Sequence, residues 1–326
     1  MRKKLVLFLL VCGLVMGVGI VPNATATTVA LDTYWDLGYP AGTHPDSTPY
    51  PAGPGDWSGD SDGNSTTSTF NQIQYFSETT TYQYDDNGIA GLDAGTTSIS
   101  GDTFVDHGNA YGTALLPASP PVDTEGLNAA YEFTFSWSNL EGTLTEFNDG
   151  DITDTYTISY TSGTIEFYVD DTGAWASHGS DLGVADDTNF ENGTLVAVVE
   201  ITEGTGHSNF EADTIIFTGG DYNVTGYFTY LIDGFWFEAG TDVDLQQYVT
   251  LEWLLSYSAG DTDPAHFIQT MGGTDPDGNP VLFSIDANHD TSMQLLIPEP
   301  ATMLLLGSGL LGLAGFGRKK KFLKKG

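Results

Sequence analysis

Two short acidic segments carry the residue types and spacing of a calcium-binding turn. The residues concerned are Asp60, Asp62 and Asn64 in the first segment and Asp275, Asp277 and Asn279 in the second. In each segment a glycine before the asparagine permits a sharp turn, so the alternating oxygen ligands match the first half of a calcium loop. Neither segment has the glutamate, six residues after the glycine, that completes an EF-hand loop. Because Asp-Gly and Gly-Asn are also ordinary turn sequences, calcium sites and plain β-turns both stay open.

The other chemistry-bearing residues form no recognisable catalytic pattern. The six histidines are scattered, and no two have the spacing of a metal site. The Gly-x-Ser-x-Gly elbow of α/β-hydrolases does not occur in the body of the chain. A carboxylate pair for glycoside hydrolysis stays open in so acidic a chain, but no compact strand places three carboxylates on one face. We therefore expect no enzymatic activity, with a glycan-active hydrolase as the alternative.

Aromatic residues crowd the last third of the chain. They are Tyr227, Phe228, Tyr230, Phe235, Trp236, Phe237, Trp253 and Tyr257. Planar rings of this kind either stack on sugar rings at a carbohydrate-binding face or fill a hydrophobic core. Core packing is the favoured interpretation, and carbohydrate binding is the alternative.

Charge is distributed in an extreme way along the chain. All nine Lys and Arg residues lie in the terminal segments 2–4 and 318–325, whereas all 44 acidic residues lie between those segments, and Glu299 is the one acid that belongs to the C-terminal segment 298–326. The body therefore cannot form a salt bridge to Lys or Arg, and its self-repulsion must be offset by burial, by spacing of the acids or by bound cations. Binding to nucleic acid is disfavoured. We expect calcium to stabilise the body, and the alternative is that the acids only keep it soluble.

The sequence predicts that the elements which position these residues are β-strands. Residues 27–69 are rich in Gly, Pro and Asp and predict an irregular arm, whereas residues 70–297 alternate β-branched and aromatic runs with turn residues. The clearest signal predicts a hairpin in which residues 156–160 and 164–169 flank a turn at 161–163. We expect an all-β body, an antiparallel β-sandwich of jelly-roll or lectin-like type, with little helix.

The first 26 residues have the organisation of a signal peptide. A basic start at residues 2–4 precedes an apolar run, and Ala24 and Ala26 supply the small residues that signal peptidase needs. We expect cleavage before Thr27. Cys12 is then removed with the signal, so the exported body contains no cysteine and no disulfide.

The C-terminal segment, residues 298–326, contains three parts in a fixed order. Pro298, Glu299 and Pro300 form a rigid tripeptide that a helix cannot include. Residues 301–317 are apolar or small and, as a helix, reach about 25 Å, enough for a thin bilayer. A basic cluster follows at Arg318, Lys319, Lys320 and Lys321, which the positive-inside rule assigns to the cytoplasm. The segment predicts one pass through the inner membrane, with the body on the outer side.

This order of Pro-Glu-Pro, short apolar helix and basic cluster resembles the PEP-CTERM sorting signal of Gram-negative bacteria that make exopolysaccharide. The resemblance implies recognition of Pro298, Glu299 and Pro300 by exosortase, a membrane-embedded transpeptidase, and release or transfer of the body. A plain membrane anchor is the alternative. Residues 127–137 and 234–240 also resemble flocculation-associated members of that group. The two resemblances imply a surface or matrix protein associated with exopolysaccharide, biofilm or floc formation. From the acidic body we also expect divalent cations, chiefly calcium, to bridge the protein to anionic exopolysaccharide.

Overall fold

One large antiparallel sheet dominates the protein. The computed structural model describes residues 28–53, 64–84, 101–116, 124–148, 153–171, 190–191, 193–211, 217–247, 252–258 and 268–298. Of these, residues 30–296 belong to one compact unit, which includes the described part of the predicted arm. The strands are β1 (Thr28–Ala30), β2 (Thr33–Trp35), β3 (Gly42–Thr43), β4 (Pro49–Tyr50), β5 (Gln72–Gln83), β6 (Thr103–Leu116), β7 (Tyr131–Asn148), β8 (Thr153–Ser162), β9 (Thr164–Asp171), β10 (Thr194–Glu211), β11 (Phe217–Leu231), β12 (Trp236–Glu238), β13 (Val243–Asp244), β14 (Glu252–Ser258), β15 (Ile268–Met271) and β16 (Phe283–Pro298).

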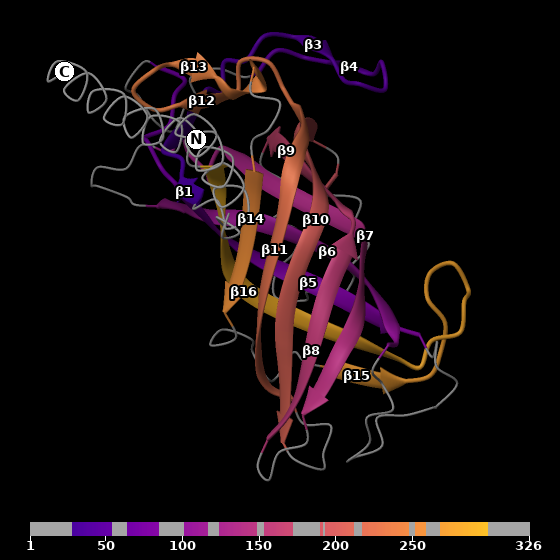
Figure 1. Ribbon diagram of the computed structural model, residues 1–326. Helices are drawn as coiled ribbons and strands as arrows, with labels where there is room; N and C mark the ends of the chain where they lie inside the picture. The colour runs from indigo at the N-terminus through magenta and orange to yellow at the C-terminus, as the bar shows by residue number, and fades with distance from the viewer. Residues whose placement is uncertain are drawn as a thin grey trace, which may run out of the picture. The chain divides into compact units, whose positions relative to one another are not determined.

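The path of the sheet closes on itself. Following the hydrogen bonds leads from β5 through β6, β7, β8, β10, β11 and β14 to β16, and β16 pairs again with β5. The β16–β5 ladder runs from Phe283 opposite Gln83 to Met293 opposite Ile73. Most neighbours follow one another along the chain, so the strands form an up-and-down meander whose long members lie side by side (Figure 1). The all-β antiparallel class is confirmed, whereas the sandwich type is not.

Helix is scarce, as the composition predicts. A single-turn 3-10 helix, η3 (Leu245–Gln247), separates β13 from the segment that leads to β14, and no longer helix occurs in the described ranges.

The hairpin predicted at residues 156–169 is wrong. β8 and β9 do not pair with each other; both pair with β7 on one side and β10 on the other, so they form one long strand interrupted at Gly163. The Asn139 side chain of β7 accepts a hydrogen bond from the Thr164 N–H at 3.2 Å, which holds the chain extended at the interruption. Two neighbouring strands thus outweigh the local turn preference of Thr-Ser-Gly.

Side chains alternate between a buried and a solvated face along the long strands. Tyr156, Ile158 and Tyr160 of β8 are buried, while the intervening Thr157 and Ser159 are half-exposed. In a closed sheet the buried face is the inner one, because only that face is shielded from water on all sides. The period-two pattern of the sequence therefore identifies the inner residues even where it misassigns the turn.

Trp35 of β2 joins the N-terminal residues to the core. β2 pairs with β12, which places Trp35 opposite Trp236, and both indoles are almost completely buried. The Trp35 ring lies 4.6 Å from Phe133 of β7 and 5.0 Å from Phe70, between ring centroids. Burial of several large aromatic rings at one point is a major source of stability. The described part of the predicted arm therefore contributes to the core through this residue.

Candidate functional site

A carboxylate is buried on the inner face of the sheet. Asp106 of β6 is 7% exposed, and its Oδ2 accepts a hydrogen bond of 2.7 Å from the Tyr160 hydroxyl of β8. Its Oδ1 has no hydrogen-bond partner among the described residues. Since the body has no Lys or Arg, this charge cannot be compensated by an ordinary ion pair.

Gly142 explains how Tyr160 reaches Asp106 across an intervening strand. β7 lies between β6 and β8, and Gly142 pairs with Phe104 on one side and with Tyr160 on the other. With no side chain at this position, the rings of Phe104 and Tyr160 meet edge to face at 5.2 Å. A Cβ on Gly142 would overlap the Phe104 ring.

Burial dominates the acid–base properties of this pair. It raises the pKa of Asp106 from 3.8 to about 6, and hydrogen bonds from the hydroxyls of Thr81 and Tyr160 offset only part of that increase. The pKa of Tyr160 is raised well above 10, first by burial and then by the charge of Asp106. Tyr160 therefore stays a hydrogen-bond donor throughout the range in which Asp106 titrates.

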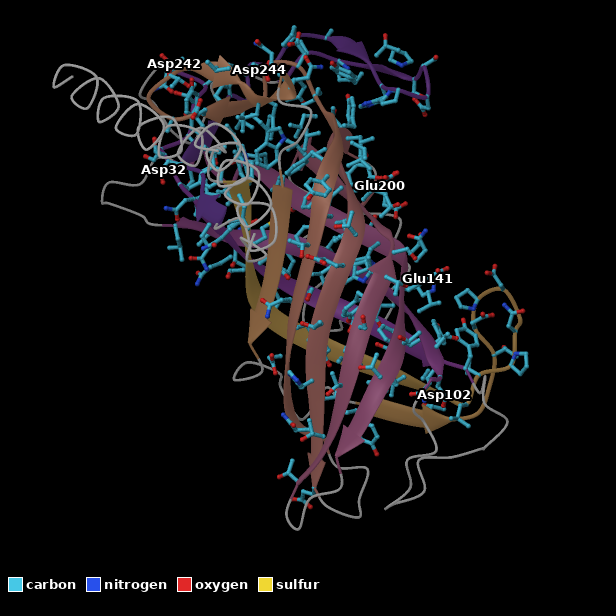
Figure 2. The ribbon with its side chains drawn as sticks, viewed as in Figure 1. Asp32, Asp102, Glu141, Glu200, Asp242 and Asp244 are labelled. Carbon is cyan, nitrogen blue, oxygen red and sulfur yellow. The ribbon has the colours of Figure 1, made fainter. Side chains whose placement is uncertain are left out.

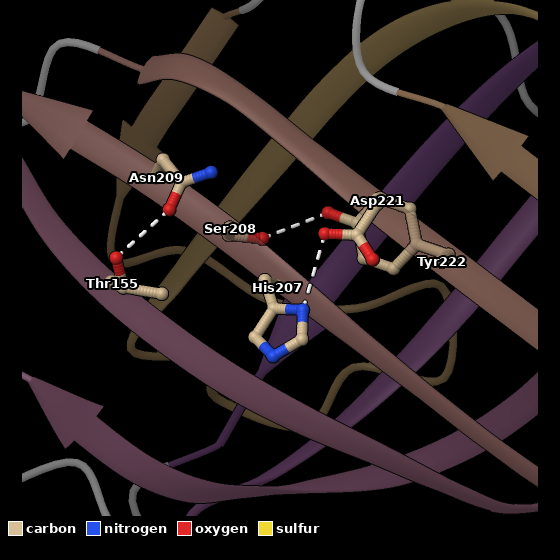
Figure 3. A network of polar contacts seen from close by, with 6 residues as sticks. All are labelled: Thr155, His207, Ser208, Asn209, Asp221 and Tyr222. Atoms are coloured by element: carbon tan, nitrogen blue, oxygen red, sulfur yellow. Dashed lines mark hydrogen bonds and ion pairs between the residues drawn. The ribbon is translucent and has the colours of Figure 1, made fainter.

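The outer face of the same strands is polar and solvated. On β10, His207 and Asn209 point outward, whereas Ser208 points inward and hydrogen-bonds the Tyr222 hydroxyl at 2.8 Å (Figure 3). His207 Nδ1 lies 3.1 Å from Asp221 Oδ1, and both side chains are about half exposed. This outer contact is an ion pair only when His207 is protonated.

Carboxylates are spread over the outside of the body. Asp32, Glu141, Glu200 and Asp242 lie at separate places on the ribbon (Figure 2). The exposed acids among the described residues are Asp32, Asp46, Glu141, Glu191, Glu200, Glu203, Glu211, Asp221, Asp233, Asp242 and Asp277. Spacing the acids in this way reduces their mutual repulsion, because charges more than a Debye length apart, about 8 Å at physiological salt, are largely screened.

The second acidic segment forms a tight turn. The Asp275 N–H donates to the Asn279 carbonyl at 2.9 Å, and Gly278 takes a positive φ of 85° that a side chain would disfavour. Asp275 Oδ1 accepts from the Asn279 N–H at 2.7 Å, and Oδ2 accepts from the Asn279 amide at 2.9 Å and the Tyr84 hydroxyl at 2.8 Å. The hydrogen bonds from Asn279 and Tyr84 lower the pKa of Asp275. Asp277 is exposed beside them.

The structure accounts for this segment as a hydrogen-bonded turn, and calcium binding there stays a prediction. In the first segment, Asp60 and Asp62 lie outside the described residues, while Asn64 accepts hydrogen bonds from Thr66. Across the ranges that the structure describes, no cluster of three or more His, Cys, Asp or Glu side chains forms a metal-binding group.

Three of the eight crowded aromatic residues pack in the core. Phe228, Phe235 and Trp236 are buried, and Phe237 stacks on Tyr34 at 5.3 Å. Tyr227 is the exposed large aromatic residue among those described, at 43%. The side chains of Trp253 and Tyr257 lie outside the described set. The core interpretation therefore accounts for Phe228, Phe235 and Trp236, but not for Tyr227.

The predicted targeting residues lie almost entirely outside the described part of the chain. This applies to Ala24, Ala26, Thr27, Glu299, Pro300, the apolar segment 301–317 and the basic cluster Arg318, Lys319, Lys320 and Lys321. Pro298 is described, as the final residue of β16. Among the described residues, none of the helices has the length and apolar character needed to cross a membrane.

Comparison with protein families identifies the C-terminal segment. A family model for the PEP-CTERM protein-sorting motif matches residues 296–320, which include the Pro-Glu-Pro tripeptide, the apolar segment and part of the basic cluster. Comparison with curated protein sequences found no match. The chain thus carries a PEP-CTERM sorting motif at its C-terminus, which implies an exported protein that is processed by exosortase and sorted to the cell surface.

Proposed function

We propose that this protein is a non-enzymatic component of the cell surface or extracellular matrix that associates with anionic exopolysaccharide through bound divalent cations. The observation that supports the proposal is an outer surface carrying many exposed carboxylates on a body without a single Lys or Arg. Such a surface repels an anionic polymer at low salt and attracts divalent cations. Calcium, which takes six to eight oxygen ligands, can share its coordination between protein and uronate carboxylates.

A role in biofilm or floc formation follows from the same proposal. A sorted surface protein that holds polysaccharide through calcium links the cell to its matrix. The resemblance of residues 127–137 and 234–240 to flocculation-associated members of the PEP-CTERM group supports this role.

An exported carbohydrate-binding or carbohydrate-active protein is the second candidate, and the described aromatic residues support it less. Stacking on sugars needs exposed rings, whereas Phe228, Phe235 and Trp236 are buried. Tyr227 alone offers an exposed ring among the described residues of that group.

Calcium-dependent binding to a polyuronate tests the proposal. The full exported protein should co-sediment with alginate gel particles in about 1 mM calcium, the upper end of the range of dissociation constants of extracellular calcium modules. Chelation should release it, and neutral dextran should not retain it under either condition. If the protein stays on alginate after chelation, or is retained equally on dextran, the result contradicts cation bridging and favours direct sugar recognition.

Thermal melting tests whether calcium binds the folded body. At matched ionic strength, calcium should raise the melting temperature above the values in magnesium or sodium, because a ligand of the folded state at a hundred times its Kd adds about 2.7 kcal/mol. Asp275→Asn probes the turn at Asp275, with Glu203→Gln as the control for loss of one exposed charge. Equal melting in all three salts would leave only the solubility role of the acids.

A further inference from the structure

Tyr227 is the large aromatic side chain that stays exposed among the described residues, at 43%. It lies on β11 directly opposite Glu200 of β10, so the ring and the carboxylate share one face of the sheet. That face is the outer one, because Glu200 is exposed whereas the neighbouring pair, Val199 and Phe228, is buried. Figure 2 shows Glu200 beside the upper part of the long strands. An exposed ring therefore lies next to an exposed carboxylate.

Two β-bulges flank the pair formed by Glu200 and Tyr227. On one side Thr202 is the extra residue of β10, and its hydroxyl donates to the Thr225 carbonyl at 3.3 Å. On the other side Thr229 is the extra residue of β11, and its hydroxyl donates to the carbonyl of residue 198 at 3.4 Å. Bulges of this kind change the direction of side chains and are common next to functional sites.

The bulge at Thr202 places a second carboxylate near the ring. Glu203 pairs with Thr225, which lies two residues before Tyr227 and therefore shares its face. In a regular strand Glu200 and Glu203, three residues apart, would point to opposite faces, but here both are exposed on the outer face. Directly opposite Cβ atoms are about 5 Å apart and diagonal ones up to about 8 Å apart. Both carboxylates are thus within reach of one ligand that covers the ring.

The charge of this face suits a ligand that is both cationic and partly apolar. The body has no Lys or Arg to pair with the two carboxylates, and His207, the histidine on β10, contacts Asp221 instead. The face of a tyrosine ring also attracts cations. A flat ring of this kind stacks on the C–H groups of a sugar. An amino sugar combines the two properties, because its ammonium group can pair with a carboxylate while its ring covers the tyrosine.

We propose that the outer face formed by Glu200, Glu203 and Tyr227 binds a de-N-acetylated amino-sugar segment of a polysaccharide. The sugar ring stacks on Tyr227, and its ammonium group pairs with Glu200 or Glu203. This contact is direct and needs no bridging calcium. It therefore goes beyond the calcium-mediated contact with anionic polysaccharide and does not depend on it.

Titration calorimetry of the full exported protein with a glucosamine oligomer tests the proposal. A chelator is present throughout, so that calcium does not contribute, and a slightly acidic buffer keeps the sugar amines protonated and the glutamates ionised. The protein should bind this oligomer, and binding should weaken as the salt concentration rises, because salt screens exposed charges. The N-acetylated oligomer of the same length, which has the same rings without the charges, should not bind.

Variants at the two positions of the central pair separate stacking from charge. Tyr227→Ala should weaken binding about two- to fivefold, the range for a cation over an exposed ring, whereas Tyr227→Phe keeps the ring and should bind like the wild type. Glu200→Gln should weaken binding by a similar factor. Glu211→Gln removes an exposed carboxylate at the far end of the same strand and is the matched control, with binding unchanged.

Three results would overturn the proposal. Equal binding of the N-acetylated oligomer would show that the ammonium group is not recognised. Equal losses for Glu200→Gln and Glu211→Gln, with none for Tyr227→Ala, would show diffuse attraction to an acidic protein. An oligolysine of the same charge whose binding falls equally with Tyr227→Ala would show a face for basic peptides. Calcium-dependent retention on alginate is measured separately, so each of these failures leaves the proposed function standing.

Discussion

Replacing Asp106 by Asn is expected to abolish about 3 kcal/mol of pH-dependent stability. The pKa of Asp106 rises from 3.8 to about 6 on folding, mainly through burial, and each pKa unit corresponds to about 1.4 kcal/mol. A raised folded-state pKa means that the folded protein binds the proton more tightly than the unfolded chain. The contribution is therefore fully present below pH 3.8 and is lost as the pH rises through 6.

The measurement is urea unfolding of wild type and Asp106→Asn at a series of pH values. The free energy of unfolding of the wild type, minus that of the variant, should increase by about 3 kcal/mol between pH 7.5 and pH 3. Other acids also titrate in this window, but they titrate in both proteins and cancel in the difference. Glu203→Gln removes one exposed charge of the same sign and should track the wild type. Parallel curves for wild type and Asp106→Asn would show that Asp106 is not a buried carboxylate.

Replacing Trp35 by Ala is expected to cost about 3 to 5 kcal/mol of stability, the range for removing a large buried aromatic side chain. Trp35 is fully buried, and its ring contacts Phe70, Phe133 and Trp236, which come from distant parts of the chain. A loss of this size is a large fraction of the 5 to 15 kcal/mol that stabilises a typical protein. The midpoint of urea unfolding should fall accordingly.

Two further variants serve as comparisons for Trp35→Ala. Trp35→Phe keeps an aromatic ring and removes an indole Nε1 that is buried without a hydrogen-bond partner among the described residues, so it should cost less than Trp35→Ala. Tyr227→Ala removes a ring that is 43% exposed, and its effect should stay within about 0.5 kcal/mol. If Trp35→Ala behaves like Tyr227→Ala, the N-terminal residues are not part of the stabilising core.

Strands that alternate strictly show a period of two in the sequence, and strands with glycines at buried positions do not. β8 and β10 show a clear period of two, whereas β6 contains Gly108 and Gly112 at buried positions where the pattern expects large side chains. Those glycines make room for Trp137 and Phe133 of the neighbouring strand. The type of a residue reflects the surroundings of its own side chain. The space left by a glycine and filled by a side chain of the next strand therefore cannot be predicted from the local pattern.

The candidate sites divide in a similar way. The sorting motif can be predicted from the sequence because its three parts are contiguous and occur in a fixed order. The match over residues 296–320 confirms it. Asp106 gives no such signal: it is one aspartate among many, and its burial depends on Gly142 and Tyr160, which lie 36 and 54 residues further along the chain. The sequence leaves Asp275, Asp277 and Asn279 open between calcium ligands and a plain turn; Asp275 and Asn279 are hydrogen-bonded to each other in a turn, and calcium binding there stays a prediction.

The pairing of β16 with β5 has a consequence for the order of folding. Thr80 and Asp286, joined by a hydrogen bond of 2.7 Å across this pair, are 206 residues apart. Contacts of such long range incur a large loop-closure entropy and form slowly. The β5 edge must therefore wait, unpaired with β16, until the last strand has crossed the membrane. Before β16 pairs, the meander is an open sheet with two free edges, and the pairing of the residues just before the sorting motif completes the fold.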